Sequence, residues 1–218
     1  MQDLAEALYL EINEEPLGSI FRKQQSITRL FPDFVDKVDA VRNRGGIRLV
    51  DDAPGLWHFQ VVSGTQDGVK YDVYVQFADI RDQVLKQAQD MRLWKQDKSG
   101  VDLRKLGSRL MDVCDIRVKC TCPAFLYWGF KYITTKRGTI YGEPEKRRPK
   151  VRNPKEYGIV CKHIQLVLNQ LGYYTTTLGN HVKKFFGKDL AKAEDLARRK
   201  LAGVRKGAEF LKRRLQNA

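Results

Sequence analysis

Two short pairs of metal-ligating residues, Cys120-x-Cys122 and Cys161-x-His163, constrain the fold of this chain more than any other feature. A strand places residues two positions apart on the same face, so a strand ending at Cys122 would bring the first two thiols together. A helix that begins near Cys161 would favour a thiolate there and would hold His163 in its first turn. Three cysteines and one histidine form a complete ligand set for tetrahedral Zn²⁺, with no position left for a catalytic water. The spacing therefore predicts a structural zinc site.

The remaining cysteine and the other two histidines are expected to be structural. Cys114 lies six residues before Cys120 and is expected to be a buried thiol, with a substitute ligand as the alternative. His58 follows Trp57 in a predicted strand, and His181 falls in a predicted Gly179-Asn180-His181 turn. The acidic first residues do not resemble a secretory signal, so we expect an intracellular protein whose cysteines form no disulfide framework.

The flanking residues of both pairs resemble the SWIM-type zinc finger. The matching contexts are Cys122-Pro123-Ala124-Phe125 and Cys161-Lys162-His163-Ile164, within residues 116–171. The resemblance implies a ββα zinc module whose ligands are Cys120, Cys122, Cys161 and His163.

The segment between the two pairs departs from the usual SWIM spacing because it is 38 residues long. It contains Tyr127-Trp128-Gly129 and Arg152-Asn153-Pro154, which are similar to inserts in tailed-phage proteins that carry this motif. This second resemblance implies a virion protein as one possible class.

Hydrophobic periodicity predicts an α+β protein with one antiparallel sheet, flanking helices and a long basic C-terminal helix. Strand patterns and a hairpin turn at 64–68 predict strands at 47–50, 56–62, 69–77 and 116–122. Helical spacing predicts helices within 4–31, 32–45, 79–94, 103–110 and 161–171, and from Lys188 onward. Residues 131–155 contain three prolines and are expected to form a loop or hairpin. We expect three parts: 1–100, helical and sheet; 101–175, the zinc module with its insert; and 176–218, the basic helix.

The charge of the chain is strongly asymmetric. The net charge is +14 over 218 residues, yet residues 1–100 carry −3 and residues 101–218 carry +17. Residues 131–155 alone hold nine basic and two acidic side chains. Such asymmetry indicates a polyanionic partner, most often nucleic acid and less often an acidic protein or an anionic membrane surface. No apolar run is long enough for a membrane helix, so no membrane partner is expected.

These observations favour a non-enzymatic nucleic-acid-binding protein, with DNA preferred over RNA. The residues expected to contact phosphates are Lys136, Arg137, Lys146, Arg147, Arg148, Arg152, Arg199, Arg213 and Arg214. A further set of aromatic residues either stacks on bases or covers a small core, namely Phe125, Tyr127, Trp128, Phe130 and Tyr132.

The alternative is a structural or assembly protein, such as a virion component, that docks a protein partner or further copies of itself through the zinc module. No phosphate-binding glycine loop, zinc-protease helix or nucleophile elbow is present in the sequence. A Cys161/His163 nucleophile pair is conceivable, but the two additional cysteines favour metal ligation. We therefore expect a chain without enzymatic activity, in the reducing cytoplasm or nucleoid or else in a virion.

Overall fold

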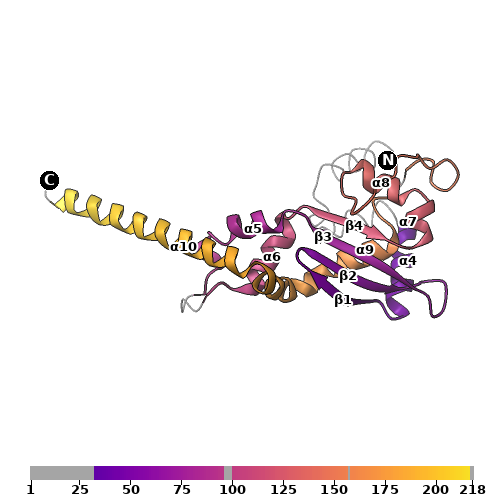
Figure 1. The fold of residues 1–218 in the computed structure, drawn as a ribbon, viewed down its shortest axis with the longest axis horizontal. Helices are drawn as coiled ribbons and strands as arrows, with labels where there is room; N and C mark the ends of the chain where they lie inside the picture. The colour runs from indigo at the N-terminus through magenta and orange to yellow at the C-terminus, as the bar shows by residue number, and fades with distance from the viewer. Residues whose placement is uncertain (1–31, 96–99, 157, 217–218) are drawn as a thin grey trace. The chain divides into compact units, whose positions relative to one another are not determined.

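The computed structural model describes residues 32–95, 100–156 and 158–216 (Figure 1). Over these residues the chain is α+β, with a four-stranded antiparallel sheet and a long C-terminal helix, as the sequence predicts. The predicted helical segment within 4–31 lies outside the described residues. The chain divides into two compact units. Among the described residues, the sheet unit combines those up to Ile80 with those of 111–174, and the helical unit combines those of 81–110 with those from Thr175 onward.

The sheet is an antiparallel meander in the order β1-β2-β3-β4. Its strands are β1 (Ile47–Ala53), β2 (Leu56–Val62), β3 (Lys70–Phe77) and β4 (Ile116–Cys120). The four predicted strands are present, with two differences in their bounds. Strand β1 extends to Ala53 and not only to residue 50, and β4 ends at Cys120 and does not continue to Cys122.

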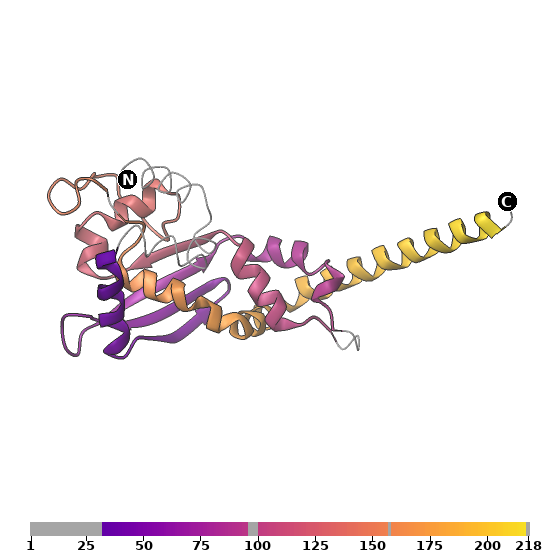
Figure 2. The same ribbon diagram turned by 180° about the vertical axis from the view of Figure 1, so that it is seen from behind.

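One face of the sheet carries the core of the sheet unit. The strict alternation of β2, β3 and β4 puts their apolar residues on this face, so Phe59, Val73 and Cys120 form one cross-strand row of fully buried side chains. Helices α4 (Pro32–Asn43) and α9 (Lys162–Gln170) cover this face and contact each other (Figure 2). A side chain on the buried face at the end of β4 therefore lies beneath a helix.

The other face of the sheet is partly exposed. The ring of His58 stacks on Tyr74 at a centroid distance of 4.6 Å, and His58 Nε2 lies 2.7 Å from Asp72 Oδ1. Lys119 Nζ lies 5.9 Å from the Tyr74 ring. His58 therefore has a structural role in the sheet, as expected.

The segment after β4 contains two short helices, α7 (Pro123–Tyr127) and α8 (Phe130–Lys136). The prediction of loop or hairpin for residues 131–155 was therefore wrong for 131–136. The three prolines all follow this part, and Ile133 and Thr134 are buried, so tertiary packing supports a helix there. Beyond α8 the chain is irregular, and Ile140 makes one parallel bridge to Val118 of β4.

The helical unit contains most of α5 (Ile80–Gln87) and α6 (Leu103–Val113), together with η1 (Met91–Leu93) and α10 (Thr175–Gln216). Two predictions need correction. Helix α5 ends at Gln87, well before residue 94, and α10 begins at Thr175 instead of Lys188. The η2 turn (Leu171–Tyr174) precedes α10, so Gly172 does not separate the helices by a long loop.

Close helix packing explains the early start of α10. A Cβ atom at Gly107 would overlap the carbonyl of Thr175, and one at Gly179 would overlap the carbonyl of Leu103. The predicted turn at Gly179-Asn180-His181 is therefore helical, and His181 is buried. Helix α10 has one non-helical residue, Phe186.

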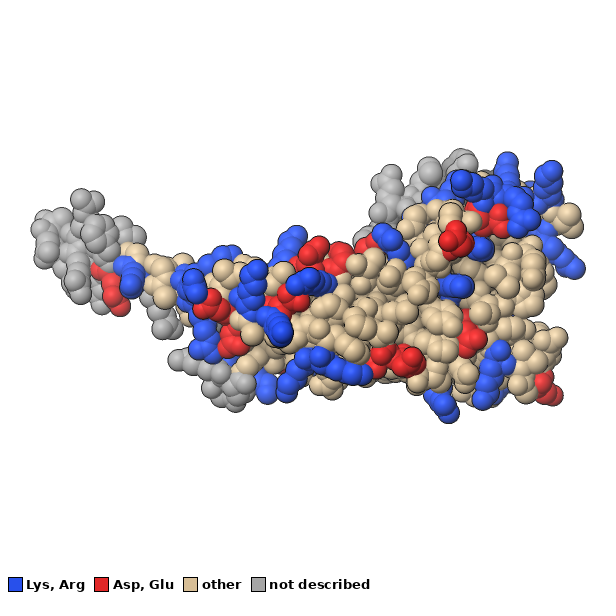
Figure 3. Space-filling view, in the orientation of Figure 1, with Lys and Arg blue, Asp and Glu red and all other residues tan. Residues whose placement is uncertain are grey.

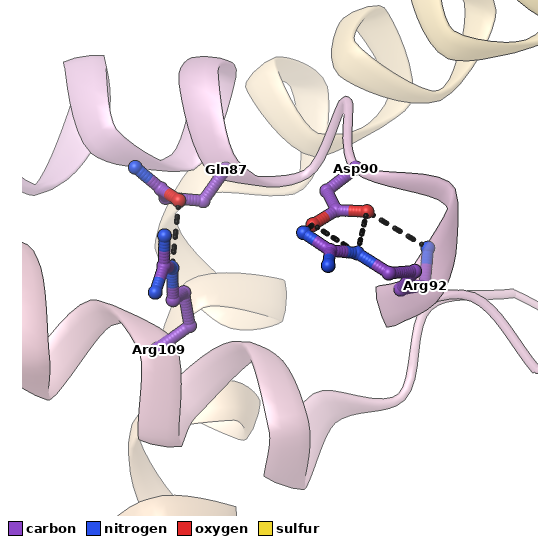
Figure 4. Close-up of polar contacts among 4 residues, drawn as sticks. All are labelled: Gln87, Asp90, Arg92 and Arg109. Atoms are coloured by element: carbon purple, nitrogen blue, oxygen red, sulfur yellow. Dashed lines mark hydrogen bonds and ion pairs between the residues drawn. The ribbon is translucent and has the colours of Figure 1, made fainter.

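Polar contacts link the shorter elements of the helical unit (Figure 4). Arg109 Nε donates to Gln87 Oε1 at 3.0 Å, which joins α6 to the end of α5. Arg92 pairs with the Asp90 carboxylate at 2.7 Å, and this contact lowers the pKa of Asp90. Across the described residues, no helix is both long and apolar enough to cross a membrane.

Candidate metal centre

Four separate structural positions supply the predicted ligands. Cys120 is the last residue of β4, and Cys122 is the N-cap of α7. Cys161 is the N-cap of α9, and His163 is the second residue of that helix. The sheet and the two helices thus hold the ligands from three directions.

The first pair converges by a different route from the one predicted. Pro123 has no backbone N–H for a ladder, but its fixed φ suits the first position of a helix. The chain therefore turns from β4 into α7 at Cys122, whose backbone N–H donates to Cys120 Sγ at 3.4 Å. Cys122 Sγ in turn accepts a hydrogen bond from the Phe125 N–H at 3.3 Å. The two thiols meet across a turn, not along one strand face.

The four side chains form one buried cluster. Their ligating atoms all lie within 4.8 Å of one another. None of the four residues is more than 2% exposed. The cluster is therefore positioned to hold a metal ion, and three sulfurs with one imidazole nitrogen are compatible with zinc.

The electrostatics of the cluster favour a bound cation. Burial raises the pKa of the Cys120 and Cys161 thiols, because a thiolate is poorly solvated there. Hydrogen bonds from the Cys120 and Cys161 thiols hold the pKa of Cys122 far below its ordinary value. Neighbouring sulfurs cannot all ionise in this volume without a positive charge, and a divalent ion supplies one.

His163 supports the same conclusion. Both of its ring nitrogens are buried and lack a hydrogen-bond partner among the described residues. Burying an imidazole in this way costs free energy, which coordination of a cation by one nitrogen would offset. The His163 ring also lies 4.8 Å from the Tyr71 ring, which fixes one side of it.

The two lysines next to the ligands in sequence lie in different places. Lys162 lines the same cavity as Cys122 and His163, so its charge lies near the cluster. Lys119 projects over Tyr74 on the opposite face of the sheet. Of these two lysines, only Lys162 is therefore placed to offset the negative charge of the cluster.

Cys114 lies apart from the cluster. It is 1% exposed, and it is not among the residues that could share a metal ion. Burial, together with the nearby Asp79 and Asp115, raises the pKa of its thiol. This agrees with the expected buried thiol.

The segment between Cys122 and Cys161 is called the insert. Its basic residues lie on the sheet unit near α7 and α8, where blue side chains gather in Figure 3. Two glutamates pair with several of them. Glu145 accepts hydrogen bonds from Arg147, which lower its pKa to about 2. Glu156 binds Lys136 at 2.9 Å and also pairs with Arg148, which lowers its pKa. Charge pairing thus shapes the insert into a defined surface.

The other predicted phosphate contacts fall into three groups. Arg137 is the C-cap of α8, and Lys146 and Arg152 are exposed on the insert. Arg199 pairs with Asp195 on α10, in the helical unit. The side chains of Arg213 and Arg214 lie outside the described ones.

The aromatic residues after Cys122 differ in exposure. Phe125 is fully buried and belongs to the core, whereas Tyr127 is 76% and Trp128 is 44% exposed. The Arg152 guanidinium lies 5.3 Å from the Trp128 ring. Lys37 and Tyr71 are distant from Trp128 in the sequence, yet they line a cavity together with it. No sequence pattern predicted this cavity.

Comparison of the chain with protein-family models, with curated proteins and with solved structures found no match. Function is therefore inferred from the residues of the chain itself.

Proposed function

We propose that this chain is a non-enzymatic nucleic-acid-binding protein whose fold is stabilised by a structural zinc ion. Cys120, Cys122, Cys161 and His163 would hold the ion as a SWIM-like ββα module. Four protein ligands saturate tetrahedral zinc, which favours a structural role over catalysis. The ion would supply a fixed link between β4, α7 and α9.

The observation that carries this proposal is the position of the basic insert directly after a metal ligand. Gly129 joins α7 to α8 with a φ of +93°, and a Cβ atom there would meet the ring of Pro149. The arginine-rich segment of the insert is therefore packed against the joint between these helices. A metal ion that fixes Cys122 would also fix the surface that meets phosphates.

Salt dependence of DNA binding tests the proposal. The zinc-loaded chain is mixed with labelled random-sequence duplex DNA over about 50 to 300 mM salt, and affinity is measured by fluorescence anisotropy. A triple variant, Lys146→Gln with Arg147→Gln and Lys150→Gln, should weaken binding. It should also reduce the slope of log affinity against log salt by about 2 to 3.

The matched control removes the same charge elsewhere on the sheet unit, by Arg42→Gln, Arg48→Gln and Arg117→Gln. Its slope should stay close to that of the unaltered chain. Absence of binding to any form of DNA at the lowest salt, or equal losses in both triple variants, would contradict the proposal.

An assembly protein is the second candidate, and one observation favours it. Val204 on α10 is 69% exposed, on a helix whose sequence carries further apolar residues. A contiguous exposed apolar patch on a helix is typical of a protein interface. A concentration-dependent molecular mass in analytical ultracentrifugation that Val204→Glu abolishes would support this candidate.

A further inference from the structure

A cavity of about 610 Å³ lies beside the cysteine–histidine cluster. Cys122 and His163 form one part of its wall, and the turn between β2 and β3 at Ser63–Gln66 forms another. Trp128 and Arg152, which belong to the insert, also line the cavity. Its volume falls within the range of small-molecule sites, which is about 300 to 1,000 Å³.

The charged side chains of this cavity are all basic. They are Lys37 from α4, Arg152 from the insert and Lys162 from the first turn of α9. Among the described lining residues there is no aspartate or glutamate. A ligand with a negative charge fits this wall, and an acidic protein side chain or a phosphate would supply it.

The uncharged part of the wall is rich in aromatic rings. Tyr71, Trp128 and Phe130 line the cavity, and none of the three is fully buried. The Arg152 guanidinium, 5.3 Å from the Trp128 ring, combines a cation with a flat stacking surface. A planar ring linked to a phosphate satisfies both features, which selects a nucleotide over an acidic peptide.

A second hollow of about 560 Å³ shares Arg152 with the first. Its basic lining residues include Lys131, Arg147 and Lys150, and Tyr127 supplies a largely exposed ring. Glu145 also lines it, but Arg147 already binds this carboxylate. The two hollows thus adjoin at Arg152, and together they offer a ring-lined cavity beside a basic groove.

We propose that the chain binds single-stranded nucleic acid by inserting one unpaired base into the cavity beside Cys122 and His163. The phosphates that follow this nucleotide lie along the basic groove of the second hollow. This inference rests on the proposed nucleic-acid function and specifies the form of the ligand. A base held in a duplex is stacked and paired, so it cannot enter the cavity without leaving the helix.

Binding of a single-stranded oligothymidylate of about 12 nucleotides and of a duplex of equal length tests the inference. The zinc-loaded full chain is used, with anisotropy as the readout. Trp128→Ala should weaken single-strand binding by about fivefold to a hundredfold, the usual loss for one base-stacking ring, and leave duplex binding unchanged. Trp128→Phe, which keeps a stacking ring, should restore most of the affinity.

Two further variants separate the cavity from general effects. Arg152→Gln should weaken single-strand binding more than Arg48→Gln, which removes the same charge from the edge strand β1. Tyr173→Ala removes an aromatic side chain that is 87% exposed elsewhere in the sheet unit, and should have no effect. Oligothymidylate should also quench the tryptophan fluorescence of the unaltered chain more than that of the Trp128→Phe variant.

Three outcomes are decisive. Selective loss of single-strand binding in Trp128→Ala and Arg152→Gln supports the inference. If single-strand affinity is unchanged in both variants, the cavity site is overturned. The proposed function still stands in that case if the chain binds duplex DNA. Absence of binding to both forms of DNA overturns the proposed function and the inference with it.

Discussion

Cys122 and Cys161 lie at equivalent places on two different helices, because each is the N-cap of the helix that follows it. Cys122 has φ and ψ of −69° and 150°, and Cys161 has −70° and 159°. Cys122 Sγ accepts a hydrogen bond from the Phe125 N–H of the first turn of α7, whereas Cys161 makes no side-chain cap hydrogen bond. The positive end of a helix favours negative charge at both positions. Pro123 follows Cys122 and Lys162 follows Cys161, so different residues at the first helical position are compatible with the same N-cap conformation. One cysteine of each pair is therefore positioned by the N-cap of a helix.

Replacement of a ligand should release the metal and destabilise the sheet unit. In Cys122→Ala or His163→Ala the zinc content should fall from about one ion per chain to near zero. The free energy of unfolding should decrease by about 5 kcal/mol or more, because binding of a structural zinc ion contributes directly to folding. Elemental analysis of the purified chain and thermal unfolding followed by circular dichroism measure the two effects.

Two control variants make this result specific. Cys114→Ala removes a buried thiol outside the cluster and should retain the full zinc content. His163→Cys supplies a fourth sulfur ligand and should keep the metal where His163→Ala does not. Full zinc occupancy in Cys122→Ala would show that the cluster is not the metal site.

The thiol of Cys114 should resist alkylation in the folded protein. Burial, Asp79 and Asp115 raise its pKa above the ordinary value of 9.0, so the thiolate that reacts with iodoacetamide is scarce at pH 8. Mass spectrometry of the zinc-loaded chain should find Cys114 unmodified after a time that fully labels it in denaturant. Labelling at equal rates in both conditions would contradict its burial.

The sequence correctly predicted that these four side chains come together, but not the way in which the first two meet. Alternation from Ile116 to Cys120 places Cys120 on the buried face, and the structure confirms this. The prediction continued this alternation to Cys122 and did not take account of Pro123, which favours the start of a helix over the continuation of a strand. The proline was therefore a local signal for a helix start, but the alternation of apolar and polar residues before it favoured a continuing strand.

Tertiary contacts account for most of the remaining errors. Thr175, Thr176 and Thr177 have low helix propensity, yet they begin α10 because glycines let that helix lie directly against α6. The cavity depends on Lys37, Tyr71 and Trp128, which are brought together only by the fold. Hydrophobic period and charge balance along the chain carry no information about such contacts.

Substitution of either packed glycine should destabilise the helical unit. Gly107→Ala and Gly179→Ala each place a methyl group against a backbone carbonyl, which cannot move aside as a flexible side chain would. A loss of about 1 to 3 kcal/mol in the free energy of unfolding is expected for each. Gly203→Ala is the matched control, because no atom lies near the added methyl group. This variant should gain up to about 1 kcal/mol, and chemical denaturation that ranked all three alike would contradict the packing.

Acid should release the metal before it breaks the Glu145–Arg147 pair. The pair lowers the pKa of Glu145 from 4.5 to about 2, so its contribution to stability is complete above pH 4.5 and is lost only as the pH falls toward 2. Metal ligands must be deprotonated, so protons compete with zinc at higher pH, and stability falls as they bind. Arg147→Gln should therefore leave the acid midpoint of zinc release unchanged, as measured with a chromogenic chelator alongside circular dichroism. A midpoint that moved with Arg147→Gln would instead mean that this ion pair, and not the cysteine–histidine cluster, controls the acid stability of the sheet unit.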